Sequence, residues 1–283
     1  MIMDPTMITQ IQNRSEHEPI YRKQYPCTFS GLSSIMNKHY LIHLPHCGTD
    51  IPGRYMDDYF LSDDELNHNI IQYCDLYTDE LFGSLYDAFG GTKNTYSRLF
   101  FDPERFDDAY ESMHQKFGLG WFYENAILCK KPLRKTDNKS RVRAYFEQHH
   151  QDLNEKTKQK LELYGKCTII DCHSFSDERY WFHDQDLELP DICIGYEDGH
   201  VDPELVEIIT NEFREFDIGI NVPYAGSLVP TDYWQKDFRV RSVMIEINKK
   251  LYLDADNQTK SKNFETIKQK IDNILKSLSN ERI

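Results

Sequence analysis

Short apolar runs separated by longer polar stretches divide this chain into strand-like and helix-like segments. The runs at residues 41–48, 168–175 and 242–248 are rich in β-branched and aromatic types and indicate buried strands. Further strands are predicted at 95–102, 188–196 and 217–226. Helical periodicity and capping residues predict helices starting at residue 62 and over 141–164, 203–216 and 258–279. Strands that alternate with helices indicate an α/β fold, with a mixed β-sheet sandwiched between helices.

The domain organisation follows from chain length and local composition. A mixed sheet is favoured over a parallel one because SVMIEINKKLYL, residues 242–253, alternates enough to lie near one side. The 283 residues suit a single α/β domain with additions, so we expect one domain over residues 1–283. Residues 1–38 lack a clear period and are expected to be an irregular lead-in. Residues 103–140 contain several glycines and prolines, which indicates an excursion near the active site.

Charge and composition narrow the classes of partner. A net charge of −14 argues against nucleic acid and anionic membranes, whereas a small anionic substrate can still bind beside local arginines. The chain contains no apolar stretch near the ~18 residues of a membrane-spanning helix and begins without a secretory pattern, so we expect a cytoplasmic protein. Its seven cysteines include no C-x-x-C pair, which argues against a disulfide framework or a zinc knuckle.

Two histidines at strand ends are the first candidates for metal ligands. His46 and His173 follow apolar runs, and ligand sites in open α/β sheets collect at the carboxyl ends of strands. Each histidine alone can also be a hydrogen-bonded residue at a strand end. A catalytic zinc ion typically takes three protein ligands. The third ligand is open among the carboxylates of Asp50, Asp75, Asp79 and Asp171, and Asp75 can instead cap a second helix.

Glu246 lies between isoleucines in an otherwise apolar strand. An unpaired buried carboxylate costs several kcal/mol, so this residue needs a partner. One interpretation is a salt bridge to Arg239, Arg241 or Lys249. The other is a general base that removes a proton from water activated by a metal.

Four further residues are weaker candidates for substrate binding. The guanidinium groups of Arg98 and Arg105 suit a substrate carboxylate, although pairing with Asp102 or Glu104 is the alternative. Asn221 offers an amide in a glycine-containing loop. His150 lies on a predicted helix, where a solvated histidine is the ordinary interpretation.

Six motifs in order, LPHCGTDIP, DLYTDELF, SRLFFDPERF, DCHSFS, INVPYAGS and IEINKKLYLD, resemble the N-formylglutamate amidohydrolase family over about residues 40 to 254. The resemblance implies a fold similar to the zinc-dependent exopeptidases and one Zn²⁺ per chain. It also implies hydrolysis of the amide of an N-acyl amino acid, with N-formyl-L-glutamate giving formate and glutamate as the best known case. Two alternatives remain, a carboxypeptidase-like metallopeptidase acting on small peptides and a non-catalytic binding protein of the same fold.

Carried over by motif, the resemblance implies roles for eight residues. His46, Asp75 and His173 hold the metal, Glu246 activates the water, and the substrate is bound by Arg98, Arg105, His150 and Asn221. The chain departs from the family where Cys47 replaces a serine, where Glu104 replaces an asparagine, and over AGSLVP at 225–230. Because Glu104 adds negative charge beside the arginines, a neutral or differently shaped N-acyl amino acid can be the substrate.

Overall fold

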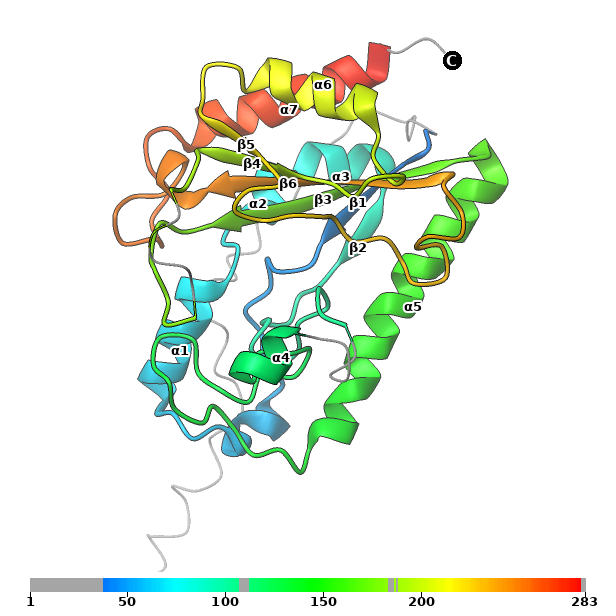
Figure 1. The fold of residues 1–283 in the computed structure, drawn as a ribbon. Coiled ribbons are helices and arrows are strands. Elements are labelled where there is room, and N and C mark those ends of the chain that lie inside the picture. The colour runs from blue at the N-terminus through cyan, green and yellow to red at the C-terminus, as the bar shows by residue number, and fades with distance from the viewer. Residues whose placement is uncertain (1–37, 107–111, 183–185, 187, 281–283) are drawn as a thin grey trace, which may run out of the picture. The chain divides into compact units, whose positions relative to one another are not determined.

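The fold is built on a mixed β-sheet (Figure 1). The computed structural model describes residues 38–106, 112–182, 186 and 188–280, and within them the sheet has six strands in the order β2-β1-β3-β6-β4-β5. The strands are β1 (Tyr40–Leu44), β2 (Gly91–Lys93), β3 (Cys167–Phe175), β4 (Ile192–Gly195), β5 (Ile218–Ile220) and β6 (Val240–Asn248). Strands β2, β1, β3 and β6 run parallel, and β4 reverses the direction beside β6. The predicted mixed sheet is confirmed.

Strand β6 lies in the interior of the sheet, between β3 and β4. The expectation that residues 242–253 run near one side of the sheet is therefore wrong. The alternation in this strand has another cause. Val243, Ile245 and Ile247 pack into the main hydrophobic core, while Glu246 projects from the opposite face.

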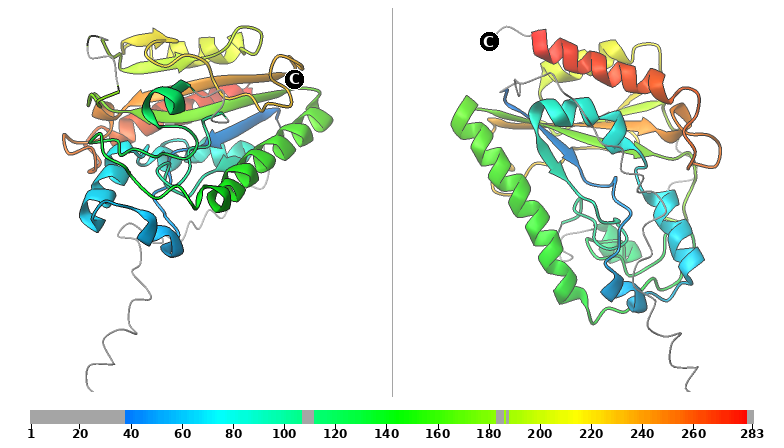
Figure 2. Two further views of the ribbon diagram at one scale, coloured as in Figure 1. Left: turned by 60° about the horizontal axis from the view of Figure 1, so that its bottom comes forward. Right: turned by 180° about the vertical axis from the view of Figure 1, so that it is seen from behind.

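Helices cover both faces of the sheet (Figures 1 and 2). They are α1 (Asp63–Tyr73), α2 (Thr78–Leu81), α3 (Gly83–Phe89), α4 (Ser112–Phe117), α5 (Lys139–Tyr164), α6 (Pro203–Glu212) and α7 (Phe264–Asn280). Side chains of α2, α3, α6 and α7 share the main core with one face of β1, β3, β4 and β6. On the other face, Leu153 of α5 packs with Leu41, Ile169 and Val240. No helix in this described part is both long and apolar enough to cross a bilayer.

The second predicted helix is divided into two short ones. Ser62 and Glu65 form the predicted capping box of α1. Asp75, in contrast, caps no helix, because α2 is preceded by Tyr77 in a left-handed conformation and has no side-chain cap. The carboxylate of Asp75 is therefore available for another role.

Residues 95–102 form a turn, so the strand predicted there is wrong. The carbonyl of Ser97 accepts hydrogen bonds from the backbone N–H groups of Phe100 and Phe101. Three consecutive apolar residues are buried because the turn directs Leu99 into one core cluster and Phe100 and Phe101 into another. Because these three residues are all buried, although in two different clusters, their sequence resembles that of a fully buried strand.

Other boundaries differ by a few residues, and some predictions stay untested. The segments predicted at 188–196, 203–216, 217–226 and 258–279 correspond to the shorter β4, α6, β5 and α7. In the region 103–140, α4 and residues such as Tyr123, Ile127 and Leu133 form a core cluster. The lead-in at 1–38 lies, apart from residue 38, outside the described residues, and the described residues all belong to one compact unit.

A close backbone approach follows β1. A Cβ atom added at Gly48 would lie 2.2 Å from the carbonyl carbon of Thr95, within backbone that cannot move independently. The backbone N–H of Asp50 donates to the carbonyl of Thr95 at 3.2 Å, which holds the two segments together. Glycine at position 48 thus allows the segment after His46 to dock on residues 94–96.

Gly48→Ala should lower the free energy of unfolding by about 1–3 kcal/mol or more, because the methyl group forces the two segments apart. Gly53→Ala is the matched control, since a Cβ atom there meets no atom within 4 Å. Urea denaturation of both variants tests this expectation, and equal stability would contradict the tight docking.

Candidate active site

Three parallel strands carry polar side chains on the face opposite the main core. In β3, Asp171 and His173 alternate with Ile170 and Cys172, which point into that core. His173 lies beside Glu246 of β6 in the strand register. His46 follows β1 by two residues, and the backbone N–H of Asp75 donates to its carbonyl at 2.9 Å. The parallel alignment of β1, β3 and β6 thus brings His46, His173 and Glu246 to one end of the sheet.

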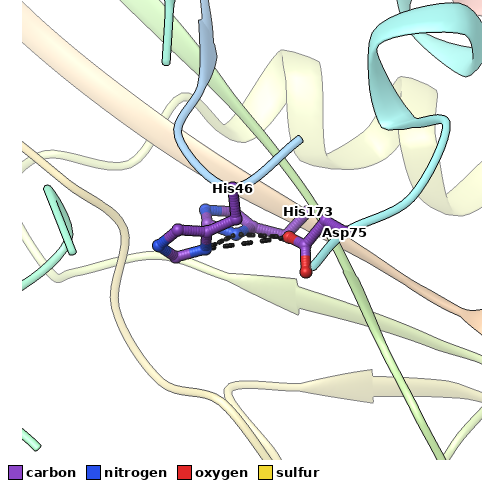
Figure 3. A group of neighbouring side chains, drawn as sticks. All are labelled: His46, Asp75 and His173. Atoms are coloured by element: carbon purple, nitrogen blue, oxygen red, sulfur yellow. Dashed lines mark hydrogen bonds and ion pairs between the residues drawn. The ribbon is translucent and has the colours of Figure 1, made fainter. Parts of the chain in front are cut away.

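His46, Asp75 and His173 face one another (Figure 3). The two Nδ1 atoms are 3.2 Å apart, and Asp75 Oδ2 is 3.3 Å from His173 Nδ1 and 3.7 Å from His46 Nδ1. All three side chains are buried. These atoms form a group that could hold a metal ion.

Of the four carboxylates considered for the third position, Asp75 is the one beside both histidines. Its Oδ2 atom also accepts a hydrogen bond from the backbone N–H of Ser174, at 3.2 Å. Asp79 pairs with Lys93 near the surface. Asp171 contacts the opposite edge of the His173 ring, and Asp50 is not part of the group.

Two buried carboxylates orient the histidine rings from behind. His46 Nε2 is 2.8 Å from Asp102 Oδ1, and His173 Nε2 is 3.1 Å from Asp171 Oδ1. An ionised carboxylate accepts a hydrogen bond from each Nε2, so Nε2 can keep its proton while Nδ1 gives its lone pair to a metal ion. This pattern of a carboxylate behind a histidine is typical of metal sites.

The separations fit zinc. Two ligand atoms, each about 2.0–2.1 Å from a tetrahedral zinc ion, lie about 3.3 Å apart. The three separations in this group, 3.2, 3.3 and 3.7 Å, bracket this value. Two imidazole nitrogens and one carboxylate oxygen are also a usual donor set for catalytic zinc.

Glu246 is buried, and its Oε2 atom has no hydrogen-bond partner among the described residues. The cations proposed as salt-bridge partners are engaged elsewhere: Arg239 pairs with Asp237, Arg241 lies 3.8 Å from Asp202, and Lys249 donates to the carbonyl of Gln72. Burial raises the pKa of Glu246 to about 8, although His173 acts in the opposite direction. The carboxyl group therefore holds a proton more readily than it would in water.

Both arginines contact Asp102. The guanidinium of Arg98 donates to Asp102 Oδ2 at 2.9 Å and stacks on the ring of Tyr73. Arg105 is more remote, with its Nε 3.9 Å from the same oxygen and in no hydrogen bond within the described chain. Both line a cavity of about 500 Å³ that also contains the three proposed ligands and Glu246.

His150 and Asn221 do not line this cavity. The His150 ring packs 4.4 Å from that of Phe146, and burial lowers its pKa to about 4. Asn221 Oδ1 accepts hydrogen bonds from the backbone N–H groups of Tyr196 and Gly226, so it orders the loop that borders the cavity. The structure thus separates both residues from the proposed ligands.

The sequence interpretation named Asp102 as a partner of Arg98 but missed His43 and the contacts of Asp102 and Glu104 with histidines. His43 Nδ1 lies 2.9 Å from Asp171 Oδ1, and its Nε2 lies 2.8 Å from His149 Nε2. Burial opposes protonation of His43, but Asp171 and Glu104 outweigh it and raise the pKa to about 9. The signal was present in the sequence, because His43 interrupts an apolar strand as Glu246 does.

Arg98→Met should destabilise the protein by about 3–5 kcal/mol at pH 7, because it leaves Asp102 buried without its closest cation. Burial opposes ionisation of Asp102, but Arg98 and His46 outweigh it and hold its pKa well below the usual range. A depressed pKa contributes stability above about pH 4 that is lost at lower pH, so the deficit of the variant should shrink in acid.

Thermal or urea unfolding at pH 7 and at about pH 3 measures this difference. Arg239→Met is the matched control, because its pair with Asp237 is largely exposed and should contribute only about 0–1 kcal/mol. Equal effects of the two substitutions would contradict the importance of the buried pair.

Comparison with known proteins extends over most of the described chain. Residues 38–253 match the model of the N-formylglutamate amidohydrolase family. No curated protein sequence gives a match. The N-formylglutamate amidohydrolase of Ralstonia eutropha JMP134 superposes with a TM-score of 0.69 at 21% identity, covering 86% of this chain and 93% of that one. A gene product of Agrobacterium tumefaciens gives a TM-score of 0.56 at 19% identity, with coverages of 86% and 92%. The chain belongs to the N-formylglutamate amidohydrolase family, a family of amide-bond hydrolases.

Proposed function

We propose that this protein is a zinc-dependent amidohydrolase that cleaves an N-formyl amino acid such as N-formyl-L-glutamate to formate and the free amino acid. One observation carries the proposal. The Nδ1 atoms of His46 and His173 and the carboxylate of Asp75 face a single position beside Glu246, inside a cavity of about 500 Å³. Family membership supports the reaction class.

Zinc held by His46, Asp75 and His173 would supply a Lewis acid that polarises the acyl carbonyl and lowers the pKa of a water molecule toward neutrality. Glu246 takes one proton from the water as the oxygen attacks the acyl carbon. It returns this proton to the amide nitrogen as the C–N bond breaks, so formate and an amine leave. A buried carboxyl group with a raised pKa suits both transfers.

The substrate carboxylate is assigned to Arg105. Arg98 is already bound to Asp102, whereas Arg105 lies farther from that carboxylate and its side chain is 21% exposed. A guanidinium binds a carboxylate through two parallel hydrogen bonds. Glu104 lines the same cavity, so substrates with neutral side chains belong in the test beside N-formyl-L-glutamate.

Removal of zinc should abolish formate release, and added zinc should restore it. His46→Ala and Asp75→Asn should each lose one zinc ion per chain and nearly all turnover, because each removes a ligand. Asp79→Asn, four residues after Asp75 and paired with Lys93, is the matched control that should keep both. Elemental mass spectrometry and a formate assay provide the two measurements.

The panel for this assay contains N-formyl-L-glutamate, N-formyl amino acids with neutral side chains, and unblocked dipeptides. Hydrolysis of dipeptides alone would favour a carboxypeptidase-like enzyme. Full activity in metal-free protein would contradict the proposed chemistry, and no turnover of any compound would favour a binding protein.

Glu246→Gln should reduce turnover by about 10²–10⁴-fold, because the amide cannot accept the proton of the attacking water. Zinc content and the unfolding temperature should remain near those of the wild type, since the side chain keeps its size. Wild-type turnover in this variant would exclude Glu246 as the general base.

A further inference from the structure

A second group of potential metal ligands lies behind the first. It consists of His43 on β1, Asp171 on β3 and Glu104 in the loop after the turn at 95–102. His43 and Asp171 are neighbours in the strand register, and both are fully buried. His43 Nδ1 is hydrogen-bonded to Asp171 Oδ1 at 2.9 Å and lies 3.4 Å from Glu104 Oε1, so the three groups are near enough to one another to share one ion.

One atom of this group lacks a hydrogen bond. Glu104 Oε1 is buried and makes none within the part of the chain that the structure describes, although the side chain as a whole is 14% exposed. Buried oxygens without hydrogen bonds are rare, and a bound ion is one explanation for such an atom. Its ion-pair partner is the imidazolium of His43, 3.4 Å away, which lies closer to Asp171.

Neighbouring residues orient the side chains of this group, as Asp102 and Asp171 orient the histidines of the first site. His43 Nε2 is 2.8 Å from His149 Nε2, so Nε2 keeps its proton when a metal ion replaces the proton that Nδ1 shares with Asp171. Asp171 Oδ2 accepts a hydrogen bond from the backbone N–H of Leu228, at 3.3 Å, which fixes that carboxylate. Partners of this kind raise the affinity of a ligand set for a metal.

We infer that His43, Glu104 and Asp171 form a second site for a divalent transition-metal ion, at the Nε2 edge of the His173 ring. One imidazole and two carboxylates suit zinc or manganese. Glu104 borders the cavity, which gives an ion a path to the otherwise buried group. The site shares no ligand with the proposed catalytic centre, so it can exist whether or not that centre binds zinc.

The second ion would act on the first site through His173. Asp171 Oδ1 and Glu104 Oε2 lie 3.1 and 3.5 Å from His173 Nε2, on the side of the ring away from Asp75. An ion that fixes both carboxylates also fixes the orientation of this ring. His43, Glu104 and Asp171 are therefore proposed as positioning residues with respect to the hydrolysis.

The experiment measures how many zinc ions each chain retains. Chelated full-length protein is loaded with ZnCl₂, desalted and measured by elemental mass spectrometry, with circular dichroism to verify folding. The wild type should retain about two zinc ions per chain, and Glu104→Gln and His43→Gln about one. Glu197→Gln removes a carboxylate that lines the same cavity but lies outside both groups, and it should retain two.

Asp75→Asn separates this inference from the proposed function. If the wild type holds one ion that Asp75→Asn loses and Glu104→Gln keeps, the second site does not exist and the catalytic centre stands. If that single ion is lost in Glu104→Gln and kept in Asp75→Asn, the second site stands and the catalytic assignment falls. Two ions in both Glu104→Gln and His43→Gln would overturn the inference. His43 is fully buried, so its replacement can prevent folding. If His43→Gln does not fold, the zinc content of Glu104→Gln alone decides the question.

Discussion

Charged groups that are removed from water must pair with one another, and the arrangement of this site depends on that constraint. Asp102 and Asp171 are fully buried, and each accepts a hydrogen bond from the Nε2 atom of one histidine. Asp102 is held in turn by Arg98 and by the hydroxyl of Tyr123. These bonds determine how the rings of His46 and His173 are turned. The direction of their Nδ1 atoms is thus set by residues that do not face the ligand position.

The positively charged side chains that line the cavity differ in how strongly other residues of the protein hold them. Arg98 is bound to Asp102, and Lys249 is buried with its ammonium group on the carbonyl of Gln72. Arg105 remains the cation with the weakest internal contacts. Glu104, adjacent to it in the chain, is drawn toward His43 and His173 instead of forming an ion pair with Arg105. Internal contacts thus fix Arg98 and Lys249 and leave Arg105 less engaged.

The sequence predicted the elements whose pattern is local, and it indicated candidate site residues where polar side chains interrupt apolar strands. The mixed sheet, the capping box at Ser62 and the long helix α5 belong to the first kind. His173 and Glu246 belong to the second, and their proximity follows from the register of β3 and β6. The turn at 95–102 was misread because its apolar residues enter two different core clusters. Asp102 and His46 are 56 residues apart, and no local pattern reports such a contact.

His173 shows why the register of the strands matters more than any single contact. Its ring lies between Asp75 on one edge and Asp171 and Glu104 on the other. Side chains two residues apart in a strand point to the same face, so Asp171 and His173 can meet only while β3 stays extended. Strands β1 and β6 flank β3, with His43 beside Asp171 and Glu246 beside His173. A shift of one residue in either pairing would turn one of these partners into the main core, and the two groups of histidines and carboxylates would no longer lie beside Glu246.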